Sequence, residues 1–165
     1  MTYRVILTGS RWWTQSIAIR AVLGDLQIEH GGDLVVVHGA CPTGADALGD
    51  LIADEFGIRR DPFAAYWDHC APICPRKPHR KMRKPGDVHH PGVLPDYCPG
   101  AGPRRNLAMA ERGAREFVAF AAAERSFGTA NMIKLAREHG IGGRKWVPGG
   151  GAPVLLPALA RRGAA

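Results

Sequence analysis

Short apolar runs that alternate with segments of helical spacing constrain the fold of this chain most strongly. Residues 3–9 and 33–38 form two such runs, and each is followed by a segment whose apolar residues recur every three or four positions. The pattern returns in the apolar run at 116–120 and the helical segment at 128–139. Because parallel strands are joined through helical crossovers, this order predicts an α/β fold with a mostly parallel sheet and helices on both of its faces.

The other expected elements follow from capping residues and apolar spacing. Thr14 is a fair N-cap for a helix that runs to about residue 30. Further along we expect a helix at 45–56, an edge strand within 58–65, a short helix at 104–112 and a last strand at 146–147. Residues 149–165 lack strong patterning apart from 154–159, and we expect a flexible tail or a short docking helix there.

The length of 165 residues suits one domain with insertions or extensions. We expect residues 1–148 to form it, interrupted at 67–103 by an insert that is rich in Pro, His, Cys, Lys and Arg and nearly free of aliphatic residues. No apolar stretch approaches the roughly 20 residues that span a bilayer, and the N-terminus reaches a glycine before a secretory apolar region could form. These features predict a cytoplasmic protein with no membrane partner, whose four cysteines are thiols or metal ligands.

The stretch HGACPTGAD, residues 38–46, follows a predicted strand and opens a predicted helix. Its two glycines allow the backbone to approach a ligand, and the amides at the start of the helix attract an anion. It lacks the lysine of the Walker A pattern and does not match G-x-G-x-x-G, so neither ATP hydrolysis nor ordinary dinucleotide binding is favoured, and no redox cofactor is expected. The alternative is a tight strand-to-helix turn capped by Thr43 or Asp46.

Two further loops are expected at the same carboxyl edge of the sheet, where α/β proteins bind their ligands. The segment Gly9-Ser10-Arg11-Trp12-Trp13 offers a hydroxyl and a guanidinium for a phosphate, and an indole for a base or sugar face. Alternatively, one or both indoles pack into the core. Gly128-Thr129 opens a helix, and Arg104-Arg105-Asn106 comes before a buried strand. Each of these last two fragments is weak alone.

Their order resembles that of the SLOG superfamily: a glycine-serine-arginine turn, a glycine-rich second turn, R-[KN]-x-x-M ending at Met109, a buried strand, and G-T opening a helix. The resemblance covers most of residues 3–147 apart from the insert. It is closest to the YspA and cpYpsA-related branch, found widely in actinobacteria and their phages, and more distant to the LOG phosphoribohydrolases and DNA-processing protein A. It implies a Rossmann-like three-layer fold that holds a nucleotide or nucleotide-derived molecule at the three loops, often in a homodimer.

The loops and the resemblance together predict the ligand-binding residues. These are Gly9, Ser10, Arg11, Trp12, Gly39, Ala40, Thr43, Gly44, Asp46, Arg105, Asn106, Gly128, Thr129 and Asn131. Among them Arg11, Thr43, Arg105 and Thr129 are expected to contact phosphate or ribose, and Trp12 or Trp13 to stack on the base. Binding without turnover would suit a sensor or a protein that sequesters a nucleotide signal.

The resemblance also implies an enzymatic alternative. In the LOG enzymes the last turn reads P-G-G-x-G-T-x-E-E, and its first glutamate acts with the arginine of R-K-x-x-M in cleaving an N-glycosidic bond. Here residues 123–125 replace P-G-G, and Asn131 stands in place of that glutamate. An amide carries no full charge and is not a base, so simple binding is favoured. A nucleotide N-glycosidase remains the alternative, with Arg105, Asp46 and Glu124 as catalytic candidates.

The insert carries a candidate metal site. Cys70, Cys74 and Cys98 offer three thiolates, and zinc bound by them and one histidine would order a loop that has no apolar core. With four protein ligands the site would be structural. The alternative is a disordered basic loop with unused thiols. Similarity to family members, which carry C-x-x-x-C, a histidine in a basic stretch and Y-C-P before R-R-N, favours His79 as the fourth ligand; the other histidines that remain open are His69, His89 and His90.

The net charge of +7 is largely local, because six of the 22 basic residues fall within residues 76–84. This run could bind nucleic acid through several phosphates, as a third candidate function. The aromatic residues that usually stack on single-stranded bases are missing from the run itself. A solvated loop, or contact with the phosphates of a small ligand, is the simpler interpretation.

Overall fold

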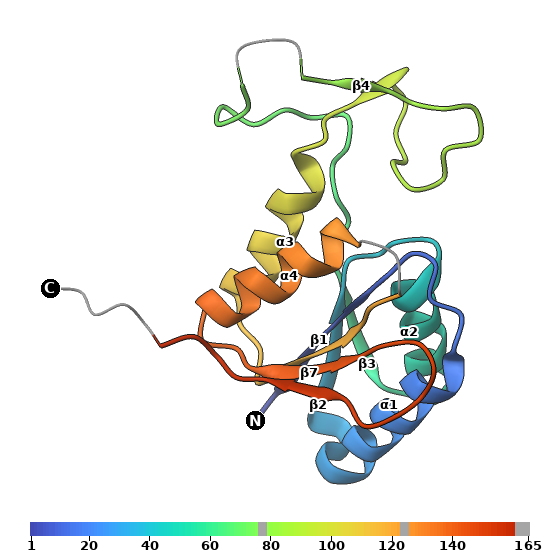
Figure 1. Cartoon of the computed structure of the whole chain (residues 1–165), viewed down its shortest axis with the longest axis vertical. Coiled ribbons are helices and arrows are strands. Elements are labelled where there is room, and N and C mark those ends of the chain that lie inside the picture. The colour runs from blue at the N-terminus through green and yellow to red at the C-terminus, as the bar shows by residue number, and fades with distance from the viewer. Residues whose placement is uncertain (76–78, 123–125, 161–165) are drawn as a thin grey trace, which may run out of the picture.

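A six-stranded sheet forms the centre of the molecule (Figure 1). The computed structural model describes residues 1–75, 79–122 and 126–160. Along the sheet the strands are β3 (Arg59–Pro62), β2 (Leu34–His38), β1 (Tyr3–Gly9), β6 (Glu116–Phe120), β7 (Gly143–Trp146) and β8 (Val154–Leu156). All neighbours pair in parallel except β8, which is antiparallel to β7. The predicted α/β fold with a mostly parallel sheet is confirmed, and β3 is the edge strand expected near residues 58–65.

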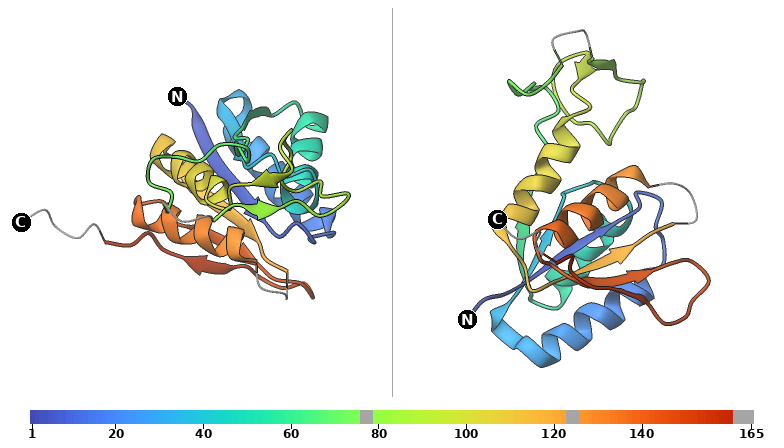
Figure 2. Two further views of the ribbon diagram at one scale, coloured as in Figure 1. Left: turned by 90° about the horizontal axis from the view of Figure 1, so that it is seen from above. Right: turned by 60° about the vertical axis from the view of Figure 1, so that its left-hand side comes forward.

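Two pairs of helices cover the two faces of the sheet, which gives three layers (Figure 2). On one face lie α1 (Ser16–His30) and α2 (Gly44–Glu55), joined to the sheet through Val5, Leu7 and Val36; a short 3-10 helix, η1 (Gly31–Asp33), connects α1 to β2. On the other face α3 (Ala101–Arg112) and α4 (Phe127–Glu138) pack against Ile6 and Phe117. Successive side chains of a strand point to opposite faces, so the continuous apolar runs of β1, β2 and β6 serve both layers.

The start of α1 differs from its prediction. Gln15, not Thr14, is the N-cap residue, and no side chain caps the helix. The preceding Trp13 is buried, and its indole N–H donates to the carbonyl of Gln15 at 3.0 Å. Packing of this indole therefore fixes where the helix begins, and the Thr14 cap was wrong.

The segment expected as an insert leaves the sheet after β3 and lies beyond the N-terminal end of α3 (Figures 1 and 2). It contains a two-stranded antiparallel ladder of β4 (Lys81–Met82) and β5 (Asp96–Tyr97). The amide of Cys98 donates to the carbonyl of Trp67 at 2.7 Å, which joins the points where the segment begins and ends. Because α3 already starts at Ala101, the last residues of the range 67–103 belong to the core helix.

The C-terminal segment forms a strand where a tail or docking helix was expected. Val154, Leu155 and Leu156 make up β8, and Leu156 packs against the core on the side of α3 and α4. The Arg137 side chain donates to the carbonyl of Pro157 at 2.8 Å, and the amide of Leu159 donates to the carbonyl of Arg137 at 2.9 Å. Among the described residues, none of the helices has the length and apolar character that crossing a membrane requires.

Candidate functional site

Three glycine-marked loops meet at the carboxyl edge of the sheet, because the strands that precede them are neighbours. They follow β1, β2 and β6, and β1 lies between the other two. The amide of Ser10 donates to the carbonyl of Phe120 at 2.8 Å, and the amide of Ala45 donates to the carbonyl of Ser10 at 3.1 Å. The first loop is thus bonded to the end of β6 and to the start of α2.

The second loop passes too close to its neighbours for side chains at two positions. Gly44 has a φ of +71°, and a Cβ added there would overlap with the backbone of Ser10 and Arg11. A Cβ at Gly39 would overlap with the guanidinium of Arg105. Gly44 is therefore needed for the packing of the loops, because it meets backbone atoms, whereas at Gly39 the Arg105 side chain could move aside.

The two capping candidates of α2 have different roles. Thr43 occupies the N-cap position, but its side chain caps no amide. Its hydroxyl lies 2.9 Å from Nε2 of His89, which reaches over from the insert. Asp46, in the first turn, is buried and accepts a hydrogen bond from the amide of Cys41 at 3.3 Å. Burial raises the pKa of the Asp46 carboxyl above its ordinary value, and the nearby Arg105 opposes that rise.

Arg105 and Asn106 connect the second and third loops. The Arg105 guanidinium donates to the carbonyls of Gly39 and Phe63, and its Nε donates to Oδ1 of Asn106 at 2.8 Å. Nδ2 of Asn106 donates in turn to Oδ1 of Asn131 at 2.9 Å and to the carbonyl of Gly128 at 3.2 Å. Burial lowers the pKa of Arg105, and the nearby Asp46 opposes that shift. The R-[KN]-x-x-M element thus braces the site from α3.

The two indoles of the first loop have opposite surroundings. Trp13 is buried and packs against Phe120 with ring centroids 5.4 Å apart, so it belongs to the core. Trp12 is 64% exposed, and Phe127, the first residue of α4, is 77% exposed. Of the two candidates for stacking on a base, only Trp12 has a ring face open to a ligand.

Two adjoining cavities open among these loops. The loop cavity, of about 340 Å³, is lined by Thr8, Gly9, Ser10, Arg11, Trp12, Cys41, Asp46, Arg105, Asn106, Ser126, Phe127, Gly128 and Thr129. The insert cavity, of about 600 Å³, lies between the loops and the insert, whose Trp67, Lys81, His89, His90 and Tyr97 form part of its wall. Arg11, Arg105, Asn106 and Gly128 line both, so the cavities share a boundary. Each volume lies within the range typical of small-molecule sites, about 300 to 1,000 Å³.

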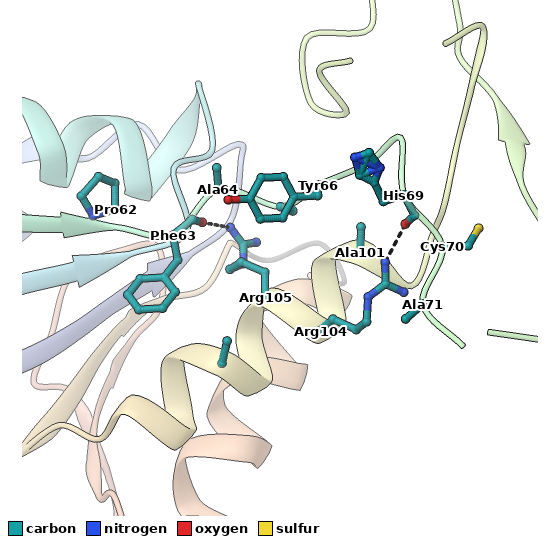
Figure 3. A pocket seen from close by; sticks show the side chains of 12 residues that line it. Pro62, Phe63, Ala64, Tyr66, His69, Cys70, Ala71, Ala101, Arg104 and Arg105 are labelled. Carbon is teal, nitrogen blue, oxygen red and sulfur yellow. Dashed lines mark hydrogen bonds between the residues drawn. The ribbon is translucent and has the colours of Figure 1, made fainter. Parts of the chain in front are cut away.

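A third cavity, of about 420 Å³, lies between α3 and the chain that follows β3 (Figure 3). Two side chains of its wall bridge these segments: Arg105 donates to the carbonyl of Phe63, and Arg104 donates to the carbonyl of His69 at 2.7 Å. These bonds tie the chain that follows β3, and the start of the insert, to α3.

Four side chains of the insert form a compact cluster. The ligand atoms of Cys70, Cys74, His79 and Cys98 lie within 4.8 Å of one another. Sγ of Cys74 is 3.6 Å from Sγ of Cys98, and Nε2 of His79 is 3.4 Å from Sγ of Cys98 and 3.5 Å from Sγ of Cys70. A tetrahedron with zinc–ligand bonds of about 2.0 to 2.3 Å separates its corners by roughly 3.5 to 3.8 Å. The cluster is therefore compatible with zinc.

Hydrogen-bond donors surround these sulfur atoms. Arg104 donates to Sγ of Cys74 at 3.2 Å, Arg80 donates to Sγ of Cys70 at 3.4 Å, and the amide of Ala71 donates to Sγ of Cys74 at 3.3 Å. Burial disfavours the Cys98 thiolate, but hydrogen bonds with His79, Arg104 and Cys74 outweigh it and lower the pKa of Cys98 to about 6. Such donors stabilise the thiolate form that a metal requires.

Part of the chain is similar to a known family. Residues 3–69 match the model of the YspA, cpYpsA-related SLOG family. The matched range contains the first two loops of the site, while α3, the third loop and most of the insert lie beyond it. Among curated proteins, none matches the chain.

The structure brings most of the predicted ligand-binding residues together. All of them line one or both cavities except Thr43 and Gly44. Thr43 contacts the insert, and Gly44 allows the loops to pack closely. The catalytic candidate Glu124, together with the rest of residues 123–125, lies outside the described residues. Of the histidines weighed as metal ligands, His79 is in the cluster, and His69, His89 and His90 are not.

Several residues of the insert were missed as site residues by sequence reasoning. His90 stacks on Tyr97 with ring centroids 4.0 Å apart, and Trp67 meets His90 edge-on at 4.6 Å. These rings and Lys81 line the insert cavity. The only indication in the sequence that these residues could bind a ligand is that aromatic residues flank a Cys/His-rich segment. That pattern does not predict which cavity the side chains face.

The basic run at 76–84 is partly engaged within the insert. Its residues 76–78 lie outside the described part of the chain. Arg80 pairs with Asp96 at 2.9 Å, and Arg83 pairs with Asp68 at 2.6 Å. Two of the charges expected to face a polyanion are thus committed to holding the insert together.

Proposed function

We propose that this protein binds a nucleotide or nucleotide-derived small molecule at the carboxyl edge of its sheet. The observation that carries the proposal is the convergence of three loops on two adjoining cavities of ligand size. The similarity of residues 3–69 to a SLOG family supports a nucleotide-type ligand. Binding without turnover suits a sensor or a protein that sequesters its ligand.

The residues offer separate contacts for the parts of a nucleotide. Ser10 and Thr129 are buried side chains that line the loop cavity, and Thr129 lies in the first turn of α4, a helix N-terminus that suits a phosphate. Arg11 is exposed, lines both cavities, and has no hydrogen-bond or ion-pair partner among the residues that the structure describes. Trp12 offers an indole face to the base. Arg105 contributes charge, but its hydrogen bonds to loop carbonyls make it mainly a brace.

Calorimetric titration with nucleotides tests the proposal. In Arg11→Met the affinity should fall about tenfold or more, because a charge-assisted hydrogen bond to phosphate is lost while no hydrogen bond or ion pair among the described residues is lost. Arg112→Met is a matched control, since Arg112 is exposed at the far end of α3 and lines none of the cavities described above. Equal affinities for the two variants and the wild-type protein would contradict the assignment of Arg11.

Asp46 supports an enzymatic alternative, a nucleotide N-glycosidase. It is a buried carboxylate in the wall of the loop cavity, and its raised pKa suits a general acid or base. Incubation with nucleoside monophosphates, followed by chromatography for free base, tests this activity. Base release by the wild-type protein that is abolished in Asp46→Asn would establish turnover and displace simple binding.

We further propose that Cys70, Cys74, His79 and Cys98 hold a structural zinc ion. Three thiolates and an imidazole are a common zinc ligand set, and four protein ligands leave no position for a reacting water. The cluster stands directly before α3, since the amide of Ala101 donates to the carbonyl of Cys98 at 3.1 Å. The ion would order the insert next to the loops. Protein purified without a histidine tag should contain about one zinc per chain, and Cys74→Ser should contain much less; less than half an equivalent in the wild type would contradict the proposal.

A further inference from the structure

The insert cavity has a polar character different from that of the loop cavity. Asp46 is a carboxylate in the wall of the loop cavity, whereas no carboxylate in the described part of the chain lines the insert cavity. The insert cavity instead adds Lys81 to the two arginines that both cavities share. Its electrostatic environment is therefore the more favourable of the two for an anion.

Three side chains in the wall of the insert cavity offer hydrogen-bond donors. Arg11 and Lys81 have no hydrogen-bond or ion-pair partner within residues 1–75, 79–122 and 126–160, and both can only donate. Oδ1 of Asn131 already accepts from Asn106, so its free amide group is also a donor. A phosphate group presents only acceptors, so it suits these donors, and it gains most from the two that carry a charge.

The arrangement of the two cavities fits successive phosphates of one ligand. A first phosphate in the loop cavity would sit near Ser10 and Thr129, with the base toward the exposed ring of Trp12. The chain of the ligand would then pass Arg11, at the boundary of both cavities, and place its next group in the insert cavity near Lys81.

We propose that the insert cavity is a second phosphate subsite anchored by Lys81, so that the preferred ligand is a nucleotide with a diphosphate and not a monophosphate. This inference rests on the proposed nucleotide site and specifies its ligand class. Lys81 of β4 pairs with Tyr97 of β5. Tyr97 is followed directly by Cys98, a member of the metal cluster. The insert thereby contributes the residue that selects the length of the ligand.

Calorimetric titration of the metal-loaded full chain tests the inference. Nucleoside 5′-monophosphates and 5′-diphosphates carrying the same base are compared, for each of the common bases. The diphosphate should bind about tenfold to a hundredfold more tightly, which is the gain expected from hydrogen bonds to a charged group. In Lys81→Met most of this difference should disappear, and Lys81→Arg should keep much of it.

Lys84→Met is the matched control, because it removes the same charge three residues away, from an exposed side chain that lines none of the cavities described. It should keep the preference for the diphosphate. Zinc content and circular dichroism show whether each variant retains the fold. Two results would overturn the second subsite and leave the nucleotide site standing. One is equal affinity for the mono- and the diphosphate, and the other is a preference for the diphosphate that Lys81→Met leaves intact. Absence of binding by every nucleotide would overturn both.

Discussion

Two features of the structure require glycine at position 44. The backbone there is left-handed, and there is no space for a side chain. Its φ is +71°, and an added Cβ would overlap with the first loop. Gly57 has a similar φ of +67°, but no atom lies within 4 Å of a Cβ added there. Gly57→Ala should therefore cost about 1 to 2 kcal/mol of unfolding free energy, the usual penalty for alanine in this region. Gly44→Ala should cost clearly more, about 3 kcal/mol or above, because the backbone must also move.

Urea denaturation of the two variants measures this difference. The Gly44 variant should also bind nucleotide more weakly, while the Gly57 variant, at the far end of α2, should not. Equal losses of stability would mean that the contact between the first and second loops contributes little.

His89 gives the contact between insert and loops a pH dependence. Burial lowers its pKa below the ordinary value of about 6.5, and the nearby Arg11 lowers it further. The unfolded chain then takes up a proton at a higher pH than the folded protein does. The contribution of His89 to stability is thus complete above about pH 6.5 and is lost as the pH falls through the folded pKa. His89→Gln should lose less stability than the wild type between about pH 7 and pH 5.5 in urea denaturation; identical losses would contradict the shift.

Sequence reasoning located site residues where a motif stands directly after a strand. Ser10 and Gly39 follow β1 and β2, so the parallel topology alone brings them to one edge. It could not foresee that Thr43 would contact His89, 46 residues away, because a hydroxyl at an N-cap position predicts only a local bond. Lys81 was likewise noticed only as part of a charged run, since nothing in its local pattern fixes the direction in which an irregular insert folds back.

At the scale of elements, the apolar pattern was sufficient to predict the bounds of strands that are buried on both faces. Strand β6 has the predicted bounds, Glu116–Phe120, and β1 has the predicted bounds Tyr3–Gly9. Helix α3 begins earlier than expected because Pro103, taken as part of the insert, is tolerated in the first turn of a helix. The strand β8 was missed because a three-residue edge strand has too little alternation to be recognised without its partner β7.

The strand β8 protects the edge of the sheet and part of the core. Leu156 covers the apolar layer that contains Ile133 and Leu135, and β7 is hydrogen-bonded to β8 along one side. A chain ended at residue 148 should therefore melt several degrees lower and self-associate, because it exposes apolar side chains and an unpaired strand. A chain ended at residue 160 retains β8 and is the matched control. Calorimetry and size-exclusion chromatography measure both effects, and identical melting of the two chains would assign β8 no stabilising role.

At the scale of the whole molecule, the net charge of +7 predicts weak attraction to nucleic acid. Of the six basic residues in the run at 76–84, Arg80 and Arg83 are paired within the insert, which leaves at most four for phosphates. The affinity for single-stranded DNA should then fall with salt with a logarithmic slope no steeper than about −3. Fluorescence anisotropy across a salt series measures the slope. A steeper one would mean that charges outside the run take part, and would favour a nucleic-acid-binding function.

The hydrogen bond between the amide of Cys98 and the carbonyl of Trp67 has a consequence for how such a protein can change over time. The chain leaves the core and returns to it where this bond joins Trp67 to Cys98, and the insert between them also contacts the second loop through His89 and Thr43. Lengthening, shortening or replacing the insert leaves the register of β1, β2 and β6 untouched. It alters the wall of the insert cavity and the contact with the second loop. A lineage that keeps the hydrogen bond between Cys98 and Trp67 can acquire a new ligand preference without changes in its core.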